Sequence, residues 1–357
     1  MPVIPDYHAQ LYSTNKKGNP MNDQPKLRWG ILGAARVNER LLPAIVEARN
    51  SQLVAIASRR PGAALETLKK HAPQLEGQVA TYDNLQALLD DDNVQAVYIP
   101  LSNHEHAEWA PKAMARGKHV LIEKPMAIRV QDIDAIEAAA KQYNVKAMEG
   151  FMYRFHPQHA RVKELLDSGL IGEVRAVRAS YSFMMRPARM YRLENDCQHG
   201  GGAMWDIGPY AVHSARWCFD RDPIAVTAIS KYTESGADIA TSGVIDFGDG
   251  KHARFDVSFE CSRQSTYEMI GTKGILTCQA VWQLPGDVPV ISWSTEDGRS
   301  SIERLPAANH FNLEIEHFSD CVLNDKQPLL TFEDARMNCR VIEAVNEAAK
   351  TGRVVKF

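Results

Sequence analysis

The chain has 357 residues, which is long enough for two domains that each bury a core of their own. With 45% hydrophobic and 24% charged residues, its composition is that of an ordinary globular protein. A formal net charge of −3 gives no electrostatic reason to expect nucleic acid or an anionic membrane as a partner. No apolar run approaches the roughly 18 residues of a membrane helix, and the N-terminus has no signal-peptide pattern, so we expect a cytoplasmic protein.

The side chains that most often bind metals are not grouped in this sequence. The six cysteines lie in its second part and none forms a CxxC pair, so we expect buried free thiols in a reducing compartment. His104 and His106 flank Glu105, but no third ligand stands at a usable spacing. We therefore expect no metal site.

The first part of the chain alternates between short apolar runs and amphipathic stretches. Residues 1–25 are polar and rich in turn formers, so we expect an N-terminal arm outside the fold. Over residues 26–148 the expected strands are 27–33, 53–58, 79–82, 94–100, 119–122 and 145–148, and helices are expected at 63–71, 84–90, 107–116 and 130–142. This order predicts an α/β domain of the Rossmann type, in which a strand–turn–helix–strand unit binds a dinucleotide.

The turn after the first expected strand is a candidate cofactor site, because backbone N–H groups at a helix start face the pyrophosphate in such units. The residues expected there are Gly33, Ala34, Ala35, Arg36 and Val37. The glycine fingerprint is broken, since Ala35 and Asn38 hold its second and third positions, and a tight turn without a ligand is an open alternative. Pro43 would break a helix that ran from Arg36, so we expect the regular helix to begin near Pro43.

The end of the second expected strand indicates which dinucleotide binds. A site for NAD usually carries Asp or Glu there, to bind the ribose 2′-hydroxyl. This chain has Ser58, Arg59 and Arg60 instead. Guanidinium groups bind a phosphate through bidentate, charge-assisted hydrogen bonds, whereas a carboxylate would repel it. We therefore expect NADP rather than NAD, with two solvated arginines in a loop as the alternative.

Two further strand ends place side chains beside such a cofactor, because ligands bind at the carboxyl ends of strands in open α/β sheets. The strand 119–122 is followed directly by Glu123, Lys124 and Pro125, and Pro125 restricts Lys124 to extended geometry. We expect Glu123 and Lys124 to contact the cofactor; a surface Glu–Lys pair is the alternative. Past the strand 94–100, the residues expected to face the cofactor are Pro100, Leu101, Asn103 and His106.

From residue 149 to 357 the pattern changes to strands that follow one another. The expected strands are 174–182, 224–232, 241–247, 253–261, 265–271, 274–280 and 290–294. They predict an α+β domain with a large, mostly antiparallel sheet, which packs one face on helices 161–167 and 210–219 and leaves the other face open. Helices 310–323 and 332–350 are expected to pack back on the core.

These stretches together resemble the Gfo/Idh/MocA family of NAD(P)-dependent sugar oxidoreductases. The matching pieces follow one another in family order and are residues 29–35, 119–125, 149–157, 200–210 and 271–274. The resemblance implies a catalytic lysine at Lys124, an aspartate at Asp206 and an acid/base residue at Tyr210. A tyrosine there resembles the branch with NADP-dependent D-xylose dehydrogenase, dimeric dihydrodiol dehydrogenase and glucose-fructose oxidoreductase. In this family the open sheet face forms a dimer, which implies a homodimer or homotetramer; a solvated face suits the strand pattern nearly as well.

The three side chains make chemical sense as a catalytic group. On a helix, Asp206 and Tyr210 lie four residues apart and share one face. A free phenol, with a pKa near ~10, is a poor base at neutral pH, and a nearby ammonium such as that of Lys124 would lower this pKa. The ammonium can also stabilise a developing alkoxide, and Asp206 can orient substrate hydroxyls. A half-buried aromatic at a helix start is the alternative for Tyr210.

The expected substrate-binding residues are Arg154, Trp205, Asp206 and Tyr210. The run 184–192 is rich in arginine and methionine and precedes the glycine motif in what reads as a long loop, which suits a cover over a site. Aromatic and hydroxyl-binding side chains suit a sugar. Equally, the arginines can recognise a carboxylate or phosphate on the substrate, and both remain open.

The sequence thus predicts an NADP-dependent oxidoreductase that transfers a hydride between nicotinamide and an aldose or related cyclic polyol, near C1. A close alternative is a sugar–sugar oxidoreductase that keeps its NADP bound. A non-catalytic regulator that senses NADP is disfavoured by the intact Lys124 and Tyr210. A hydrolase that uses NAD transiently is disfavoured by Arg59 and Arg60.

Overall fold

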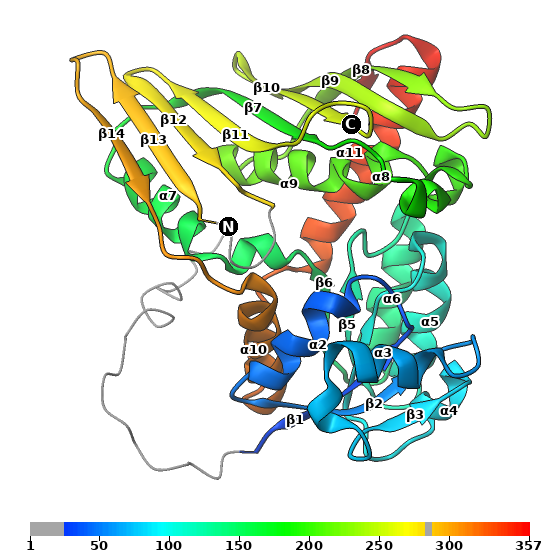
Figure 1. The fold of residues 1–357 in the computed structure, drawn as a ribbon. Coiled ribbons are helices and arrows are strands. Elements are labelled where there is room, and N and C mark those ends of the chain that lie inside the picture. The colour runs from blue at the N-terminus through cyan, green and yellow to red at the C-terminus, as the bar shows by residue number, and fades with distance from the viewer. Residues whose placement is uncertain (1–24, 283–287) are drawn as a thin grey trace, which may run out of the picture.

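The computed structural model describes residues 25–282 and 288–357, and these residues form two sheets stacked one above the other (Figure 1). The lower sheet is parallel, with six strands in the order β3-β2-β1-β4-β5-β6. Its strands are β1 (Leu27–Leu32), β2 (Ser51–Ala57), β3 (Ala80–Tyr82), β4 (Ala96–Ile99), β5 (His119–Glu123) and β6 (Ala147–Gly150). Its helices are α2 (Asn38–Glu47), α3 (Ala63–His71), α4 (Leu85–Leu89), α5 (His106–Met114) and α6 (Val130–Gln142).

The lower sheet confirms the predicted Rossmann-type domain. Its central strands are mainly apolar because helices cover both faces; every residue of β4, for example, is buried. The expected boundary between residues 148 and 149 falls inside β6, which ends at Gly150.

The expected helix start near Pro43 is wrong, since α2 already begins at Asn38 and contains Pro43. A series of turns leads into it, and the Asn38 side-chain amide donates to the Gly33 carbonyl at 2.9 Å. A proline this close to the start of a helix removes one backbone hydrogen bond, the one that would reach the Glu39 carbonyl. Burial of Leu41, Leu42 and Ile45 offsets that loss.

The upper sheet has nine strands in the order β14-β13-β12-β11-β7-β10-β9-β8-β15. Its strands are β7 (Val174–Ser182), β8 (Ala225–Tyr232), β9 (Asp238–Gly248), β10 (Lys251–Ser258), β11 (Gln264–Gly271), β12 (Gly274–Gln279), β13 (Val290–Thr295), β14 (Ser300–Arg304) and β15 (Val355–Lys356). Within the described residues, β7 and β10 pair in parallel and the other neighbours are antiparallel, which confirms the expected, mostly antiparallel sheet.

One face of the upper sheet is covered and the other is open (Figure 1). Helices α7 (Pro157–Asp167) and α9 (Gly208–Phe219) lie beneath it, and the four-residue helix α8 (Ala203–Asp206) precedes α9. The outer face carries exposed apolar side chains from strands across the sheet, namely Ile229, Val244, Ile275 and Ile302.

The C-terminal helices pack back on the core, as the sequence predicts, and they also join the two layers. Helix α10 (His310–Leu323) packs against α2 and the lower sheet, where Trp29 Nε1 donates to Ser319 Oγ at 3.1 Å. Helix α11 (Phe332–Thr351) runs from the lower layer to the upper sheet and contacts α6, α9 and β8. The chain therefore returns to its first domain after building the second.

The cysteines form no disulfide, and four of them are buried. The expectation that all are buried is wrong, because Cys261 is exposed and Cys197 is half-buried. In the part of the chain that the structure describes, no His, Cys, Asp and Glu cluster is arranged to hold a metal ion. None of the described helices is long and apolar enough to cross a membrane.

Candidate active site

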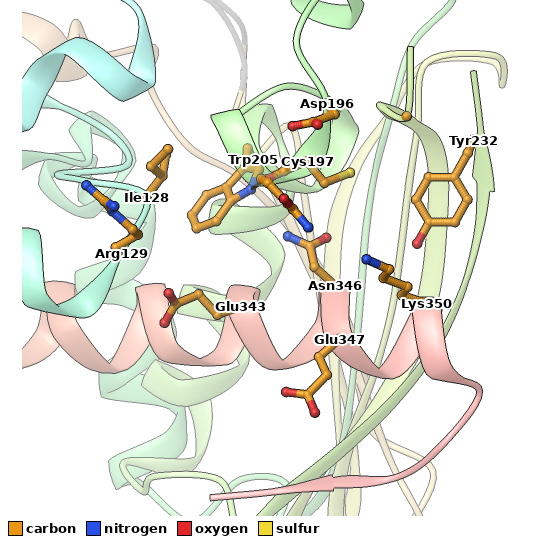
Figure 2. A pocket seen from close by; sticks show the side chains of 12 residues that line it. Ile128, Arg129, Asp196, Cys197, Trp205, Tyr232, Glu343, Asn346, Glu347 and Lys350 are labelled. Atoms are coloured by element: carbon orange, nitrogen blue, oxygen red, sulfur yellow. Dashed lines mark hydrogen bonds between the residues drawn. The ribbon is translucent and has the colours of Figure 1, made fainter. Parts of the chain in front are cut away.

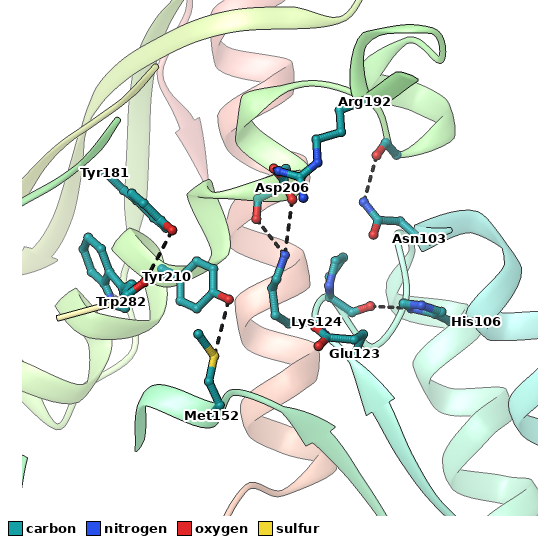
Figure 3. Close-up of polar contacts among 12 residues, drawn as sticks. Asn103, His106, Glu123, Lys124, Met152, Tyr181, Arg192, Asp206, Tyr210 and Trp282 are labelled. Carbon is teal, nitrogen blue, oxygen red and sulfur yellow. Dashed lines mark hydrogen bonds and ion pairs between the residues drawn. The ribbon is translucent and has the colours of Figure 1, made fainter. Parts of the chain in front are cut away.

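A cleft of about 680 Å³ lies where the carboxyl ends of the lower strands face the second domain (Figure 3). It brings together segments that are far apart in the sequence: the turn after β1, the residues after β4 and β5, and the loop that leads into α8. Tyr181 at the end of β7 and Trp282 close it from above. This is the edge of the sheet at which open α/β folds bind their ligands.

Most of the expected cofactor residues line this cleft. They are Ala34, Ala35, Arg36, Val37, Arg60, Pro100, Leu101, Asn103, Glu123 and Lys124. Gly33 lies just beneath, with a φ of +145° that favours glycine, and a Cβ built on it would stand 3.0 Å from Leu101 Cδ2. The turn is therefore built tightly and presents backbone and small side chains to the cleft.

Three other expected cofactor residues, Ser58, Arg59 and His106, do not line the cleft. Ser58 is buried, and its hydroxyl accepts the backbone N–H of Arg60 at 3.1 Å. Arg59 forms an ion pair of 2.6 Å with Glu105. Arg60 reaches back toward the turn, where its Nη2 stands 3.4 Å from the Ala34 carbonyl oxygen.

His106 is fully buried and acts inside the protein. Its ring nitrogens stand 2.8 Å from the Pro125 carbonyl oxygen and 3.0 Å from that of Leu101. Burial lowers the pKa of His106 to about 4, so the neutral ring donates to one of these carbonyls at a time. The ring ties the end of β4 to the loop after β5 and so supports Lys124.

Lys124, Asp206 and Tyr210 meet in the cleft, as expected (Figure 3). Lys124 Nζ donates to the backbone oxygen of Asp206 at 2.7 Å and stands 3.5 Å from its Oδ1. Arg192 holds the other carboxylate oxygen of Asp206. Glu123, next to Lys124, accepts the Tyr98 hydroxyl at 2.5 Å.

Tyr210 is buried among aromatic rings, and its hydroxyl contacts Met152 Sδ at 3.5 Å. Burial, together with the carboxylate of Glu123, raises the pKa of Tyr210 well above its ordinary value. The expectation that Lys124 lowers this pKa is therefore wrong for the chain as described. The ammonium is directed at Asp206 and stands 5.3 Å from the centre of the Tyr210 ring. The phenol keeps its proton at neutral pH.

Two expected substrate residues lie outside the cleft lining. The guanidinium of Arg154 lies over the Trp217 ring, 5.4 Å from its centre. Trp205 donates its indole N–H to the Cys197 carbonyl at 2.6 Å and lines a second cavity of about 670 Å³, which faces α11 residues such as Glu343 and Asn346 (Figure 2).

The cleft also holds side chains that the sequence analysis did not single out. Arg40 lies in the first turn of α2, a segment that the sequence analysis did not expect to be helical. Tyr181 and Trp282 come from the second sheet domain, and no local pattern in the sequence brings them to the cofactor edge.

Comparison with known proteins assigns the chain to a family. Residues 27–151 match the model of an oxidoreductase family with an NAD-binding Rossmann fold, and residues 159–277 match the GFO/IDH/MocA C-terminal domain. The chain is 34% identical over 333 residues to D-xylose 1-dehydrogenase (NADP(+)) 2 of Haloferax volcanii, covering 93% of this chain and 100% of the relative. The protein belongs to the Gfo/Idh/MocA oxidoreductase family, which confirms the resemblance seen in the sequence.

Two solved structures share the whole architecture. A 3-ketoreductase from Actinomadura kijaniata, in complex with NADP and TDP-benzene, is 30% identical with a TM-score of 0.83, and the match covers 90% of this chain and 98% of that one. An aldose–aldose oxidoreductase from Caulobacter crescentus, complexed with glycerol, is 28% identical with a TM-score of 0.82, and the match covers 93% of this chain and 100% of that one.

Proposed function

We propose that the protein is an NADP-dependent oxidoreductase that transfers a hydride between nicotinamide and a carbon of a sugar or related cyclic polyol, with an aldose C1 as the first candidate. The observation that carries this proposal is the meeting of Lys124, Asp206 and Tyr210 in one cleft at the carboxyl ends of the lower strands. The sugar-modifying relatives support the substrate class.

The residues of the cleft fit a dinucleotide. At the tight turn, a side chain in place of Gly33 would fill the space beside Leu101. The residues that lead into α2, Ala34–Val37, face the cleft. Arg60, with Arg59 beside it, would hold a 2′-phosphate, and the NADP of the Haloferax and Actinomadura relatives supports this choice. When bound, NADP supplies or accepts the hydride.

The chain's own residues manage the proton and the developing charge. In the reducing direction, the Tyr210 hydroxyl donates its proton to the substrate oxygen as the carbonyl becomes a hydroxyl; in the oxidising direction that proton returns. Lys124 Nζ donates a hydrogen bond to the same oxygen and stabilises its negative charge. Asp206, fixed by Arg192, positions the ammonium. The buried rings around Tyr210 exclude water from its hydroxyl.

The test is a screen of aldoses, keto sugars and dihydrodiols with NADP(H) and NAD(H), read at the nicotinamide absorbance band. We expect turnover with at least one sugar and with NADP(H) preferred. Lys124→Ala should abolish turnover while NADP still binds, as measured by titration. Turnover of the Lys124→Ala variant at the parent rate would overturn the assignment of the site.

A second candidate is a sugar–sugar oxidoreductase that oxidises one aldose and reduces another on a cofactor that stays bound. The likeness to the aldose–aldose oxidoreductase from Caulobacter crescentus favours it. Purified protein that carries NADP through gel filtration, and that converts two sugars without added cofactor, would support it; cofactor that dissociates in each turnover would exclude it.

We also propose that the open face of the upper sheet forms a homodimer or homotetramer. Its outward side chains include Ile229, with 75% of its surface exposed, and Ile302, with 71% exposed. Large exposed apolar side chains on one face of a sheet indicate an interface.

A further inference from the structure

One arginine of the cleft has no partner for its charge. Arg189 lies in the short 3-10 helix Pro187–Leu193 and lines the cleft. Within residues 25–282 and 288–357, its guanidinium makes no hydrogen bond or ion pair, and its Nε is buried. It lies over the Phe183 ring, 5.2 Å from the centre. Burying a cation without a hydrogen-bond acceptor costs free energy, unless a bound ligand supplies the acceptor.

Arg40 adds a second poorly compensated charge to the same region. Its nearest carboxylate is Glu39 at 3.5 Å, and Arg36 shares that carboxylate at 3.7 Å. The positive charge of Arg40 acts on the pKa values of Tyr181, Tyr210 and Arg189, so it lies near the catalytic tyrosine. Burial and then the neighbouring Arg36 and Arg192 lower the pKa of Arg189, as expected where cations crowd.

The other cations of the cleft are occupied or belong to the cofactor side. Lys124 and Arg192 both bind Asp206. Arg36 follows the tight turn at the start of α2, and Arg60 stands by the Ala34 carbonyl, which places both where a dinucleotide's phosphates are expected. Arg189 comes instead from the second domain, three residues before the arginine that fixes Asp206.

We propose, on the basis of the proposed function, that the sugar substrate carries a phosphoryl group and that Arg189, with Arg40, binds it. A guanidinium matches phosphate oxygens with two parallel hydrogen bonds, and one unpaired and one poorly compensated cation suit a group with a charge near −2. The source of this group is either a sugar 6-phosphate, which leaves C1 free to react, or the diphosphate of a nucleotide sugar, whose C1 is blocked so that another ring carbon reacts. The reacting carbon then lies at Lys124 and Tyr210 while the phosphoryl group lies at Arg189.

Direct binding tests the proposal without relying on turnover. Glucose, glucose 6-phosphate, UDP-glucose and glucuronate are titrated calorimetrically into the full chain saturated with NADP. We expect at least one of the two phosphorylated ligands to bind 10-fold or more tightly than glucose, and the stronger of the two identifies the source. Its affinity should fall as KCl is raised from 50 to 300 mM, whereas that of glucose should not.

The variants separate Arg189 from a general effect of charge. Arg189→Gln should lower the affinity for the phosphorylated ligand about 10- to 100-fold and leave the affinity for glucose unchanged. Arg189→Lys keeps the charge but loses the bidentate guanidinium, so its affinity should lie between those of the parent and Arg189→Gln. Arg186→Gln is the matched control, because Arg186 is exposed on the same segment and does not line the cleft. The dissociation constant for NADPH should be the same in all four proteins.

Three results would overturn the proposal: equal affinity for neutral and phosphorylated sugars, a preference for glucuronate alone, or a loss of NADPH affinity in Arg189→Gln, which would assign the arginine to the cofactor. Should Arg189→Gln fail to fold, Arg189→Lys and the salt dependence decide. Binding of a phosphorylated sugar without any turnover would leave this site standing and would count against hydride transfer.

Discussion

At the scale of single residues, the Tyr210 hydroxyl is the group whose removal is most informative. Its contact in the protein is Met152 Sδ at 3.5 Å, so Tyr210→Phe removes little packing. We expect turnover to fall ~10²–10⁴-fold, the usual range for a general acid, with NADP binding unchanged by titration. If the variant kept near-normal turnover, the proton would have to pass through water. His213 could not replace Tyr210, because its two ring nitrogens are already bonded to the Tyr153 hydroxyl and to Asp334.

The raised pKa of Tyr210 predicts a pH dependence with a definite sign. The phenol is protonated throughout the neutral range, so carbonyl reduction should be flat there and fall only at alkaline pH. Oxidation needs the deprotonated form and should rise over the same alkaline limb. In Tyr210→His, whose ring has an ordinary pKa of ~6.5, the limb should move toward or below neutral pH.

The pH profile is measured as kcat/KM with a deuterated substrate, because an isotope effect shows that hydride transfer, not product release, limits the rate. A limb that stays in place in Tyr210→His, with the isotope effect present, would exclude Tyr210 as the acid/base residue.

Cofactor choice also belongs to the residue scale. Arg60 lines the cleft, whereas Arg59 is already paired with Glu105. Arg60→Gln should therefore weaken NADP by ~1.5–3 kcal/mol, the range for a charge-assisted contact, and Arg59→Gln should weaken it less. NAD, which lacks the 2′-phosphate, is the control and should bind all three proteins alike. Equal dissociation constants for NADP and NAD in the unmodified protein would contradict the assignment.

Lys124 was predictable because it directly follows a strand end, and Asp206 and Tyr210 because the resemblance to the family implied them. The expectation that these two share one face of a helix is wrong, since Asp206 ends α8 and Tyr210 lies in α9, although both line the cleft. Trp205 shows where such reasoning stops. It is next to Asp206, but successive residues on a helix point about 100° apart, and its indole is turned toward Cys197 and the second cavity. Arg189 was one of several arginines in a long run, and only the fold distinguishes it from Arg186.

At the scale of elements, long periodic segments were predictable and short ones were not. Helix α6 has the expected bounds of 130–142, and β7 those of 174–182. The four-residue α8 and the edge strands β14 and β15 were missed, because so few residues show no period. The start of α2 was misjudged because the burial of its apolar face outweighs the local effect of Pro43.

A hydrogen bond between the loop after β5 and strand β6 gives a prediction about stability. The Met126 backbone N–H donates to Glu149 Oε1 at 2.6 Å, and burial raises the pKa of Glu149 to about 8. Between its ordinary pKa, near ~4.3, and about 8, the unfolded chain loses this proton while the folded chain keeps it, so stability falls as pH rises through that window. Below the window both states are protonated, and the effect is absent.

Glu149→Gln keeps an oxygen that can accept the Met126 N–H and removes the titration. The variant should exceed the parent in free energy of unfolding by ~1–4 kcal/mol at pH 8 and match it at pH 4, measured by urea denaturation. Glu347→Gln, an exposed site on α11, is the control and should show no such difference. A variant that is no more stable than the parent at pH 8 would mean that Glu149 is ionised in the folded protein.

At the scale of the whole molecule, the sequence predicted two sheets and C-terminal helices that pack back on the core. What it could not supply is the placement of the upper sheet over the lower one. That placement depends on contacts between distant segments, such as α10 on α2 and α11 across both layers. The cleft is closed by Tyr181 and Trp282 only because these layers meet, which is why neither residue was expected there.

The open sheet face gives a prediction for the assembled protein. If copies associate through it, Ile229→Lys on β8 and Ile302→Lys on β14 each place a charge in an apolar interface, and at least one should shift the protein to monomer. Leu65→Lys is the control, because Leu65 is an exposed apolar residue on α3, far from the upper sheet. Sedimentation equilibrium over a range of concentrations measures the change. A parent protein that is monomeric at micromolar concentration, or variants that all remain dimeric, would place the interface elsewhere or remove it.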